Sequence, residues 1–468
     1  MGKETKRIIL VLIGFCILFI SLIVYISYFQ VFRAEKIKAN SYNKRLWINE
    51  NSTQRGSILD RNGKVLAFSE KEEKNYERHY NYGRLYSHII GYSYREYGKT
   101  GLELKYNNTL LDISESDAIN EIKNIVNPKK EGNDIKLTID HGLQSKAREL
   151  LKDKKGSIIA LNPISGEVYA MVSMPDFDSS KLREEWKNIS EDSSGPLLNR
   201  ATQGLYTPGS IFKLITAMGL VGTPEADKTY ECIGHTVIDG YNFKDYNEIG
   251  HGEIDLEKAL VHSCNTYFAE KSILIGKDKM GEIAEKFLIN KNISFDLPVN
   301  VSKFPYKENL GQTDIAASAI GQGKVAVTPL NMVLLVSGIA NNGDIVRPTL
   351  IKEIIMTNGR IKDNRDIEII SQGTDPFIAE RIKEMMVKVV EEGTGKNAKI
   401  KNIKVAGKTG TAENQSKESH AWFIGFAPAD NPKVAVAIVL EEEGSTGGSA
   451  AAPIGRDIME YAIDNINN

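Results

Sequence analysis

An uncharged stretch of 25 residues, from Ile8 to Phe32, constrains the fold of this chain more than any other feature. A helix rises about 1.5 Å per residue, so a stretch of this length exceeds the roughly 30 Å hydrocarbon core of a bilayer. It is too long for the apolar core of a cleavable signal peptide, and no small-x-small cleavage site follows it closely. We therefore predict an uncleaved transmembrane anchor over residues 8–32.

Charge does not settle the orientation of this anchor, because basic residues flank it on both sides. They are Lys3, Lys6 and Arg7 before the stretch and Arg33, Lys36, Lys38, Lys44 and Arg45 after it. A tail of only seven residues precedes the span, and everything else follows it. This layout favours a cytoplasmic tail at residues 1–7 and an exported body.

The body has the composition of a globular protein. Of the 468 residues, 41% are hydrophobic and 26% are charged, and the length exceeds that of one ordinary domain. We therefore expect two folded units. The 59 basic and 61 acidic residues leave a net charge near −2, which gives no indication of nucleic acid binding.

The cysteines and histidines show no metal-binding pattern. Cys16, Cys232 and Cys264 form no CxxC, and none of the seven histidines stands in an HExxH or similar spacing. We therefore expect no metal ion and no other cofactor. Cys16 lies in the apolar stretch, so only Cys232 and Cys264 could form a disulfide, and two free buried thiols are the simpler expectation.

Residues 33–134 are polar, rich in Tyr and Asn, and interrupted by Gly. We expect a small β-rich module here, which we call the pedestal. Within it, Ile58-Leu59 and Val65–Ala67 flank the pair Asn62-Gly63. Because Asn-Gly favours a tight turn between antiparallel strands, this segment predicts a hairpin.

A larger domain is expected to begin at residue 135 and to run to residue 468. Apolar periodicity and β-rich runs indicate helices that surround an antiparallel sheet, an α+β arrangement, rather than a regular βαβ alternation. The expected helices lie near residues 143–151, 376–390 and 454–463, and the expected strands near 156–161, 168–172 and 433–440.

Three short motifs carry the chemistry, and each occurs twice, so a single match has little meaning. Ser-x-x-Lys is found at Ser41/Lys44 and Ser210/Lys213, Ser-x-Asn at Ser41/Asn43 and Ser263/Asn265, and Lys-Thr-Gly at Lys99–Gly101 and Lys408–Gly410. The set formed by Ser210, Ser263 and Lys408 falls within the larger domain. Its members are 53 and 145 residues apart, so only folding can assemble them.

Ser210 is suited to be a nucleophile. Pro208-Gly209 can start a helix before it, and apolar residues continue that helix, which places Lys213 one turn away on the same face. A serine hydroxyl attacks when a neighbour takes its proton, and a lysine can do so if burial and a nearby cation depress its pKa. We expect Lys213 to be that base and Lys408 to supply the second positive charge.

The segment around Lys408 lies in a β-like run from Ile403 to Thr411. Lys408, Thr409 and Thr411 are expected to hold a substrate carboxylate, and the strand edge at Gly410 to pair with an extended peptide. An N–H near Thr411 can form an oxyanion hole with that of the nucleophile.

We expect different roles for four further residues in or near the motifs. Ser263 is suited to relay a proton and Asn265 to bind a substrate amide. His262 is expected to cap or pack rather than act as a base, and Glu413 has no defined role.

Two other catalytic patterns fail at specific positions. Gly407-Lys408-Thr409 and Gly98-Lys99-Thr100 resemble part of a phosphate-binding loop, but the required upstream glycine positions hold Asn402 and Ser93. No Gly-x-Ser-x-Gly surrounds Ser210, which disfavours an α/β-hydrolase triad.

Taken together, the motifs resemble those of class B penicillin-binding proteins, which share the order Ser-x-x-Lys, Ser-x-Asn, Lys-Thr-Gly. The likeness extends over most of the chain, although the pedestal is shorter than in many class B members. The residues that carry the likeness are 206–213, 262–266 and 407–413, together with 55–63, 101–103, 321–323, 328–329 and 421–428.

This resemblance implies a D,D-transpeptidase that attacks a D-Ala-D-Ala stem peptide of peptidoglycan, releases D-Ala, and passes the acyl group to an amine. It also implies acylation by β-lactams and a transpeptidase domain with an all-helical subdomain. The expected location is the bacterial cell membrane, with one membrane span and the catalytic domain extracellular or periplasmic. Too little chain precedes the transpeptidase domain for a glycosyltransferase, so a polytopic membrane glycosyltransferase is the expected partner.

Two alternatives remain open. A β-lactamase would share the acylation but needs a second base, and no Glu-x-x-Leu-Asn element follows Ser263. A β-lactam sensor or a scaffold of a wall-synthesis complex could keep all three motifs. The sequence leaves open the acceptor amine, the wall-building process and the affinity for β-lactams.

Overall fold

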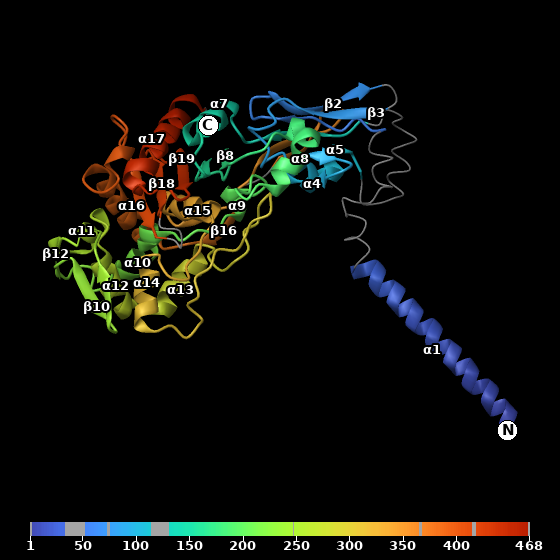
Figure 1. The fold of residues 1–468 in the computed structure, drawn as a ribbon, viewed down its shortest axis with the longest axis horizontal. Coiled ribbons are helices and arrows are strands. Elements are labelled where there is room, and N and C mark those ends of the chain that lie inside the picture. Colours follow the sequence, from blue (N-terminus) through green and yellow to red (C-terminus); the bar gives the residue numbers. More distant parts are fainter. Residues whose placement is uncertain are drawn as a thin grey trace.

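The structure is a computed structural model that describes residues 2–32, 52–72, 75–113, 131–246, 248–364, 367–413 and 418–466. Figure 1 shows a folded body and a long helix, α1, that extends away from it. The motif copies that involve Ser41, Asn43 and Lys44 lie outside the described residues, as do the other basic residues that follow the anchor.

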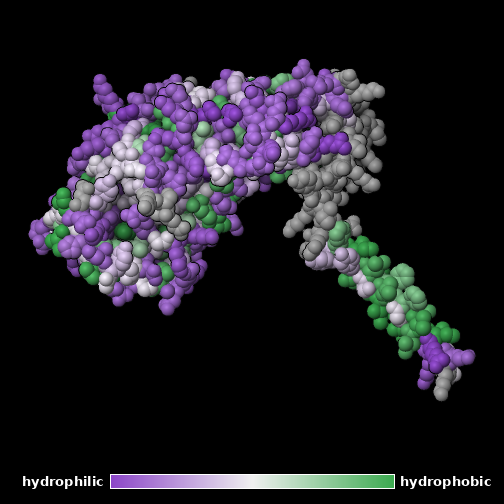
Figure 2. Space-filling view, in the orientation of Figure 1, coloured by the Kyte–Doolittle hydropathy of each residue, from purple (hydrophilic) through white to green (hydrophobic). Residues whose placement is uncertain are grey.

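The predicted anchor is one helix, α1 (Lys3–Phe32), which begins five residues before the uncharged stretch. Its side chains from Ile8 to Phe29 are exposed and almost all apolar, in contrast to the largely hydrophilic body (Figure 2). A helix satisfies its own backbone hydrogen bonds, which a bilayer core requires. By length and composition, α1 can cross a membrane.

A six-stranded sheet, in the order β15-β14-β6-β1-β2-β3, forms the centre of the pedestal side of the body. The predicted hairpin is confirmed, because β1 and β2 pair antiparallel across a turn in which Gly63 has a φ of +89°. Two strands of this sheet come from far along the chain. The strands are β1 (Ile58–Leu59), β2 (Val65–Glu72), β3 (Asn75–Tyr80), β6 (Asp134–Leu137), β14 (Ile351–Ile355) and β15 (Ile361–Asn364).

Short elements complete the pedestal side. The second Lys-Thr-Gly copy, Lys99–Gly101, lies here, where a strand passes into a helix. The elements are β4 (Ser93–Tyr94), β5 (Gly98–Lys99), α4 (Gly101–Lys105) and α5 (Asn107–Leu110).

A five-stranded antiparallel sheet, in the order β17-β18-β19-β7-β8, forms the core of the larger domain. All three strands expected from the sequence are present, and β17 is an edge strand. The strands are β7 (Gly156–Leu161), β8 (Val168–Met174), β17 (Ala406–Ala412), β18 (His420–Ala427) and β19 (Val434–Leu440).

Alternate residues of these strands enter two apolar clusters, as the pleat of a strand requires. Ile158 and Phe423 pack with α7 and α17 on one face, whereas Ile159 and Trp422 pack with α10, α15 and α16 on the other. The covering helices are α7 (His141–Leu151), α10 (Lys213–Leu220), α15 (Pro329–Ala340), α16 (Pro376–Glu391) and α17 (Gly447–Asn465). The predicted α+β fold, a sheet flanked by helices, is confirmed.

A helical subdomain lies beside α10 and carries the second motif. It differs from the all-helical expectation by two two-stranded sheets, one of which turns at Asp239-Gly240 with positive φ at both residues. Its elements are β9 (Tyr230–Cys232), β10 (His235–Ile238), β11 (Tyr241–Lys244), β12 (Gly252–Ile254), α11 (Leu256–Val261), α12 (Asn265–Ile275), α13 (Lys277–Lys286) and α14 (Gln312–Ala319).

The remaining elements are short connectors between these units. They are η1 (Ser179–Lys181), α8 (Leu182–Glu191), α9 (Arg200–Gln203), η2 (Gly209–Phe212), β13 (Asp344–Val346), β16 (Ile369–Gln372) and η3 (Lys396–Ala398), where η marks a 3₁₀ helix.

Candidate active site

Ser210 lies in the 3₁₀ turn η2, and Lys213 is the first residue of α10 directly after it. A 3₁₀ turn brings residues three apart onto one side, so the two side chains share a face as predicted. The Ser210 side chain is partly exposed, whereas Lys213 is fully buried. Among the described residues, no hydrogen bond joins the Ser210 hydroxyl to Lys213.

Glycines allow strand β17 to approach the turn that carries Ser210. A Cβ on Gly209 would lie 2.7 Å from the carbonyl oxygen of Thr411, and a Cβ on Gly410 would lie 2.9 Å from that of Pro208. Gly209 also has a φ of +56°, a conformation that glycine adopts at low cost. The first and third motifs are therefore in backbone contact.

Ser263 lies between the two buried lysines. The Lys408 Nζ donates to the Ser263 hydroxyl at 2.9 Å, and the Lys213 Nζ lies 3.3 Å from the same oxygen. Ser263 lies in the turn between α11 and α12 and has a φ of +57°, which is uncommon for a residue with a side chain. In this conformation its hydroxyl contacts both lysines. The structure thus brings residues of all three motifs together.

Lys213 is further held by two short hydrogen bonds. Its Nζ donates to the backbone oxygen of Ser263 and to Oδ1 of Asn265, both at 2.6 Å. The Nδ2 of Asn265 donates to the backbone oxygen of Lys244 at 2.9 Å. Both polar atoms of this amide therefore have protein partners, a use of Asn265 that the sequence analysis missed.

Burial changes the basicity of both lysines. Burial lowers the pKa of Lys213 to about 8, because the ammonium ion loses its hydration. Burial, and secondly the positive charge of Lys213, lower the pKa of Lys408 well below its ordinary value. A lysine with a pKa near 8 is in part a free base at neutral pH, as a proton acceptor must be.

The two threonines of the third motif have different surroundings. The Thr409 side chain is buried, and its hydroxyl lies 2.7 Å from that of Thr394. Thr411 is partly exposed, and its hydroxyl accepts a hydrogen bond from the backbone N–H of Gly447 at 3.3 Å. Thr394, which follows the end of α16, carried no motif that the sequence analysis could use.

Two neighbours of the motifs, His262 and Glu413, were expected to have no defined catalytic role. His262 is the C-cap residue of α11, and its ring stacks on that of His251 with the centroids 5.6 Å apart. Glu413 is exposed at the end of β17. Neither residue contacts the lysines within the described part of the chain.

Side chains next to the Ser210 segment form hydrogen bonds with the residues that precede it. The indole N–H of Trp422 donates to the backbone oxygen of Thr207 at 3.1 Å. The Tyr206 hydroxyl donates to Glu441 at 2.5 Å, and Arg200 donates to the same carboxylate oxygen at 2.8 Å. These residues position Ser210 from the second layer of the site.

A cluster of metal-ligand types lies next to the second motif, contrary to the expectation from sequence spacing. The ligand atoms of Cys232, Asp245, His251 and Cys264 all lie within 4.8 Å of one another. Both thiols are free and buried, as predicted. Because the four residues come from four separate segments, no short pattern could indicate the cluster.

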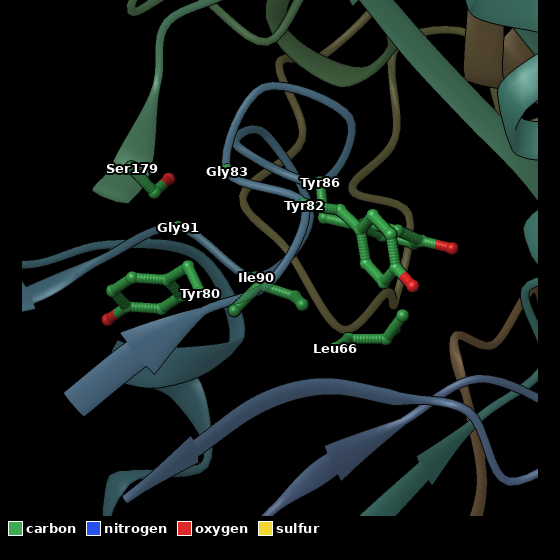
Figure 3. Close-up of a pocket in the computed structure, with 8 residues that line it drawn as sticks. All are labelled: Leu66, Tyr80, Tyr82, Gly83, Tyr86, Ile90, Gly91 and Ser179. Atoms are coloured by element: carbon green, nitrogen blue, oxygen red, sulfur yellow. The ribbon is translucent and has the colours of Figure 1, made fainter. Parts of the chain in front are cut away.

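Two cavities in the described part of the chain lie away from the motifs. One is a small cavity where the pedestal meets the larger domain, and Figure 3 shows Tyr82 and Tyr86 close together on one side of it and Ser179 on another. Its lining consists of Leu66, Tyr80, Tyr82, Gly83, Tyr86, Ile90, Gly91 and Ser179.

Comparison with known proteins places the chain in a family. Residues 156–460 match the penicillin-binding protein transpeptidase domain, and residues 55–135 match the penicillin-binding protein A dimerisation domain. The first match alone covers more than half of the chain. The chain belongs to the penicillin-binding protein family of transpeptidases.

Individual relatives support the same assignment. Peptidoglycan D,D-transpeptidase MrdA of Acinetobacter baumannii is 30% identical over 83% of this chain and 66% of that protein. Peptidoglycan D,D-transpeptidase PbpA of Mycolicibacterium smegmatis is 29% identical over 97% of this chain and 98% of that protein. The chain thus spans just under two thirds of the first relative and nearly all of the second.

Solved structures share the fold. Penicillin-binding protein A of Mycobacterium tuberculosis, solved as a ceftriaxone acyl-enzyme complex, aligns with a TM-score of 0.83 and 28% identity over 89% of this chain and 100% of that chain. The resemblance to class B penicillin-binding proteins is therefore confirmed. The activity of this chain is that of a peptidoglycan D,D-transpeptidase.

Proposed function

We propose that this D,D-transpeptidase works through an acyl-enzyme on Ser210. One observation carries the proposal: Lys408, Ser263 and Lys213 form a continuous polar contact that ends one turn from Ser210, at the free edge of β17. This is the arrangement that a serine nucleophile needs, since its proton must go to a base that stays near neutrality.

Lys213 acts as the base in its neutral form. A neutral amine has two N–H donors and one lone pair. The two donors are used by the 2.6 Å bonds to the Ser263 backbone oxygen and to Asn265, so the lone pair is left to accept the Ser210 proton, either directly or by way of the Ser263 hydroxyl 3.3 Å away. Lys408 also donates to Ser263, so one hydroxyl contacts both buried amines and can pass a proton between the base and the substrate.

The reaction then proceeds in two balanced steps. The Ser210 oxygen attacks the carbonyl carbon of the penultimate D-Ala, and the C–N bond to the terminal D-Ala breaks as Lys213 returns the proton to the leaving amine by way of Ser263. An acceptor amine next attacks the ester, loses its proton to Lys213, and releases Ser210 with its hydroxyl restored. The N–H groups of Ser210 and Thr411 hold the oxyanion in both steps.

The donor peptide binds along β17. Its extended backbone pairs with the edge of β17, the outermost strand of the five-stranded sheet. The terminal carboxylate lies against the hydroxyls of Thr409 and Thr411 and within the positive field of Lys408.

Acylation of the full chain by penicillin, followed by mass spectrometry of its peptides, tests this proposal. We expect the adduct on Ser210 and no adduct in Ser210→Ala. The chain offers a matched control, Ser41→Ala, which removes the serine of the other Ser-x-x-Lys copy and should label normally. An adduct on any other serine would overturn the assignment.

The lifetime of the adduct separates the transpeptidase from the alternatives. A penicilloyl-Ser210 ester that persists for hours fits a transpeptidase, whereas turnover within seconds would indicate a β-lactamase. Normal growth of cells whose only copy carries Ser210→Ala would point to a sensor or a scaffold.

The chain is proposed to be anchored by α1 in the bacterial cell membrane, with its N-terminus in the cytoplasm and its catalytic domain outside. This proposal rests on the length and the exposed apolar surface of α1 and on the family to which the chain belongs. A polytopic membrane glycosyltransferase would supply the glycan strands. Co-purification of the full chain with such an enzyme from detergent, compared with a chain whose α1 sequence is scrambled, tests both points.

A further inference from the structure

Thr394 contacts the third motif although it belongs to none of the three motifs. It follows the end of α16, and its hydroxyl lies 2.7 Å from that of Thr409 on β17. Thr394 is exposed, whereas Thr409 keeps only 6% of its surface accessible. An exposed side chain thus supplies a hydrogen-bond partner for an almost buried hydroxyl of the proposed binding strand.

The backbone of Thr394 is fixed by two other elements of the site. Its N–H donates to the carbonyl oxygen of Val261, the last residue of α11, at 3.3 Å. On its other side, a Cβ on Gly448 would lie 2.5 Å from the Thr394 carbonyl oxygen, and the Asn397 Nδ2 donates to the Gly448 carbonyl oxygen at 2.7 Å. The Thr394 hydroxyl is therefore held against β17 from the end of α11, which precedes Ser263, and from the first turn of α17.

Thr411, the second threonine of the third motif, also has a fixed donor. Its hydroxyl oxygen accepts a hydrogen bond from the backbone N–H of Gly447 at 3.3 Å. A hydroxyl has one proton and two acceptor lone pairs, so a hydroxyl that accepts a bond still has its proton for another group. The Thr411 O–H is therefore available to a substrate carboxylate.

We propose that Thr394 is a positioning residue that gives Thr409 the same arrangement. The Thr394 hydroxyl donates to Oγ1 of Thr409, and the Thr409 O–H donates in turn to the terminal carboxylate of the donor peptide. Hydrogen bonds in such a chain polarise one another, so the outer donor strengthens the inner bond. This role of Thr394 rests on the proposed binding of the carboxylate by the third motif.

Two O–H groups that both point outward as donors favour one kind of C-terminus. A carboxylate has acceptors only, so it can take both bonds, whereas a carboxamide presents N–H donors as well. Hydrogen bonds to an ionised acceptor are also stronger than those between neutral groups. Thr394 should therefore contribute to the preference of the site for donors with a free C-terminal carboxylate.

Acylation of the full chain by penicillin and by its methyl ester tests this role. Thr394→Val keeps the shape of the side chain and removes its hydroxyl, so it should slow acylation by penicillin about 5- to 10-fold. The methyl ester has no carboxylate, so its slower acylation should remain unchanged. Thr394→Ser should restore the penicillin rate. An unchanged penicillin rate in Thr394→Val, or an equal loss with the ester, would overturn the proposal.

Thr349→Val is a matched control for stability. Thr349 is also largely buried, and its hydroxyl lies 3.1 Å from Oδ2 of Asp296, outside the three motifs. Both valine variants lose a hydrogen bond of a threonine hydroxyl, so both should melt slightly earlier. Only Thr394→Val should slow acylation by penicillin. An equal slowing in both variants would indicate general destabilisation and contradict a positioning role.

A comparison of double variants decides whether Thr394 acts through Thr409. Added to Thr409→Val, the change Thr394→Val should cause no further loss of rate, whereas added to Thr411→Val it should cause its full loss. A full further loss in the Thr409→Val chain would refute the positioning role, because Thr394 would then act independently of Thr409. Failure of the unaltered chain to label at Ser210 would instead count against the proposed acyl-enzyme.

Discussion

At the scale of single residues, the site is built around two lysine amino groups that are buried from solvent. Lys213 and Lys408 are both fully buried and share one neutral partner, the Ser263 hydroxyl. Burying two like charges together is unfavourable unless one of them gives up its proton. The arrangement therefore favours at least one neutral amine in this pair of lysines at ordinary pH.

Acylation should follow the titration of Lys213. Its pKa is lowered to about 8, so the base is protonated at lower pH and free at higher pH. The acylation rate with penicillin should therefore rise with pH and reach half of its maximum near pH 8. Stopped-flow measurement of adduct formation checks this. A rate that stays constant between about pH 6 and 9 would contradict Lys213 as the base.

Lys408→Met should lower the acylation rate without moving that pH profile. The substitution keeps the length of the side chain but removes the donor to the Ser263 hydroxyl, and it removes no cation because burial and Lys213 already hold the pKa of Lys408 well below its ordinary value. The rate should fall about 10-fold or more across the pH range. The melting temperature should not fall and serves as the control for folding. A half-maximal rate displaced to higher pH would contradict this by showing that Lys408 acts on Lys213 as a cation.

Substitution of each threonine of the third motif should distinguish an effect on substrate binding from an effect on protein stability. Thr411→Val removes a partly exposed hydroxyl, and loss of one hydrogen bond to a charged carboxylate of about 1.5–3 kcal/mol should lower kcat/KM about 10- to 100-fold. Thr409→Val leaves the Thr394 hydroxyl without its 2.7 Å partner, so it should lower the melting temperature as well. Donor peptides with an amidated C-terminus should be indifferent to Thr411→Val. Equal losses with both peptides would argue against carboxylate binding there.

At the scale of elements, the close approach of η2 to β17 decides whether the nucleophile meets its binding strand. This approach depends on Gly209, Gly410 and Gly321, since a Cβ on Gly321 would lie 2.1 Å from the Gly209 carbonyl oxygen. Gly447 allows the first turn of α17 to reach β17 in the same way. The predicted helix at 454–463 therefore began seven residues too late, and it also ended two residues too early.

Gly209→Ala should impair acylation through geometry alone. Alanine at a φ of +56° costs about 1–2 kcal/mol, and its Cβ would also press on the Thr411 carbonyl oxygen. Gly63→Ala is the matched control, because Gly63 also has a positive φ but has nothing within 4 Å of an added Cβ. Both variants should melt earlier, and only Gly209→Ala should slow penicillin acylation by 10-fold or more. Equal acylation rates in the two variants would refute the need for close contact.

At the scale of the whole molecule, an exposed apolar helix is attached to a hydrophilic body. The body has its own apolar clusters on both faces of the five-stranded sheet, and α1 belongs to neither. The six-stranded sheet joins strands from residues 58–137 with β14 and β15 of the larger domain, so the pedestal side and the larger domain should unfold together.

Removal of residues 2–32 should release the protein from the membrane without loss of activity. The shortened chain should remain in the supernatant after centrifugation of lysed cells, and its penicillin acylation rate should lie within twofold of the full chain. A single calorimetric transition would support joint unfolding of the body. If the shortened chain still sediments with membranes, a second membrane-binding surface exists.

The sequence by itself determined the features that depend on neighbouring residues. Absence of charge over 25 positions determined α1, the Asn62-Gly63 pair determined the first hairpin, and β-rich runs determined β7, β8 and β19. Local conformation follows from local hydrophobicity and turn chemistry, which are visible in order along the chain. The ordered motifs also predicted the family correctly, and the catalytic roles of Ser210, Lys213 and Lys408 stay predictions.

Only the tertiary structure decided how these parts meet. It placed the Asn265 amide on Lys213, Thr394 on Thr409, and β14 beside β6, although each pair is well separated in sequence. It also brought together Cys232, Asp245, His251 and Cys264 from four separate segments, where sequence spacing had indicated no cluster of metal-ligand side chains. The physical reason is that such contacts arise from the packing of whole elements, whereas spacing and composition report only on each element alone.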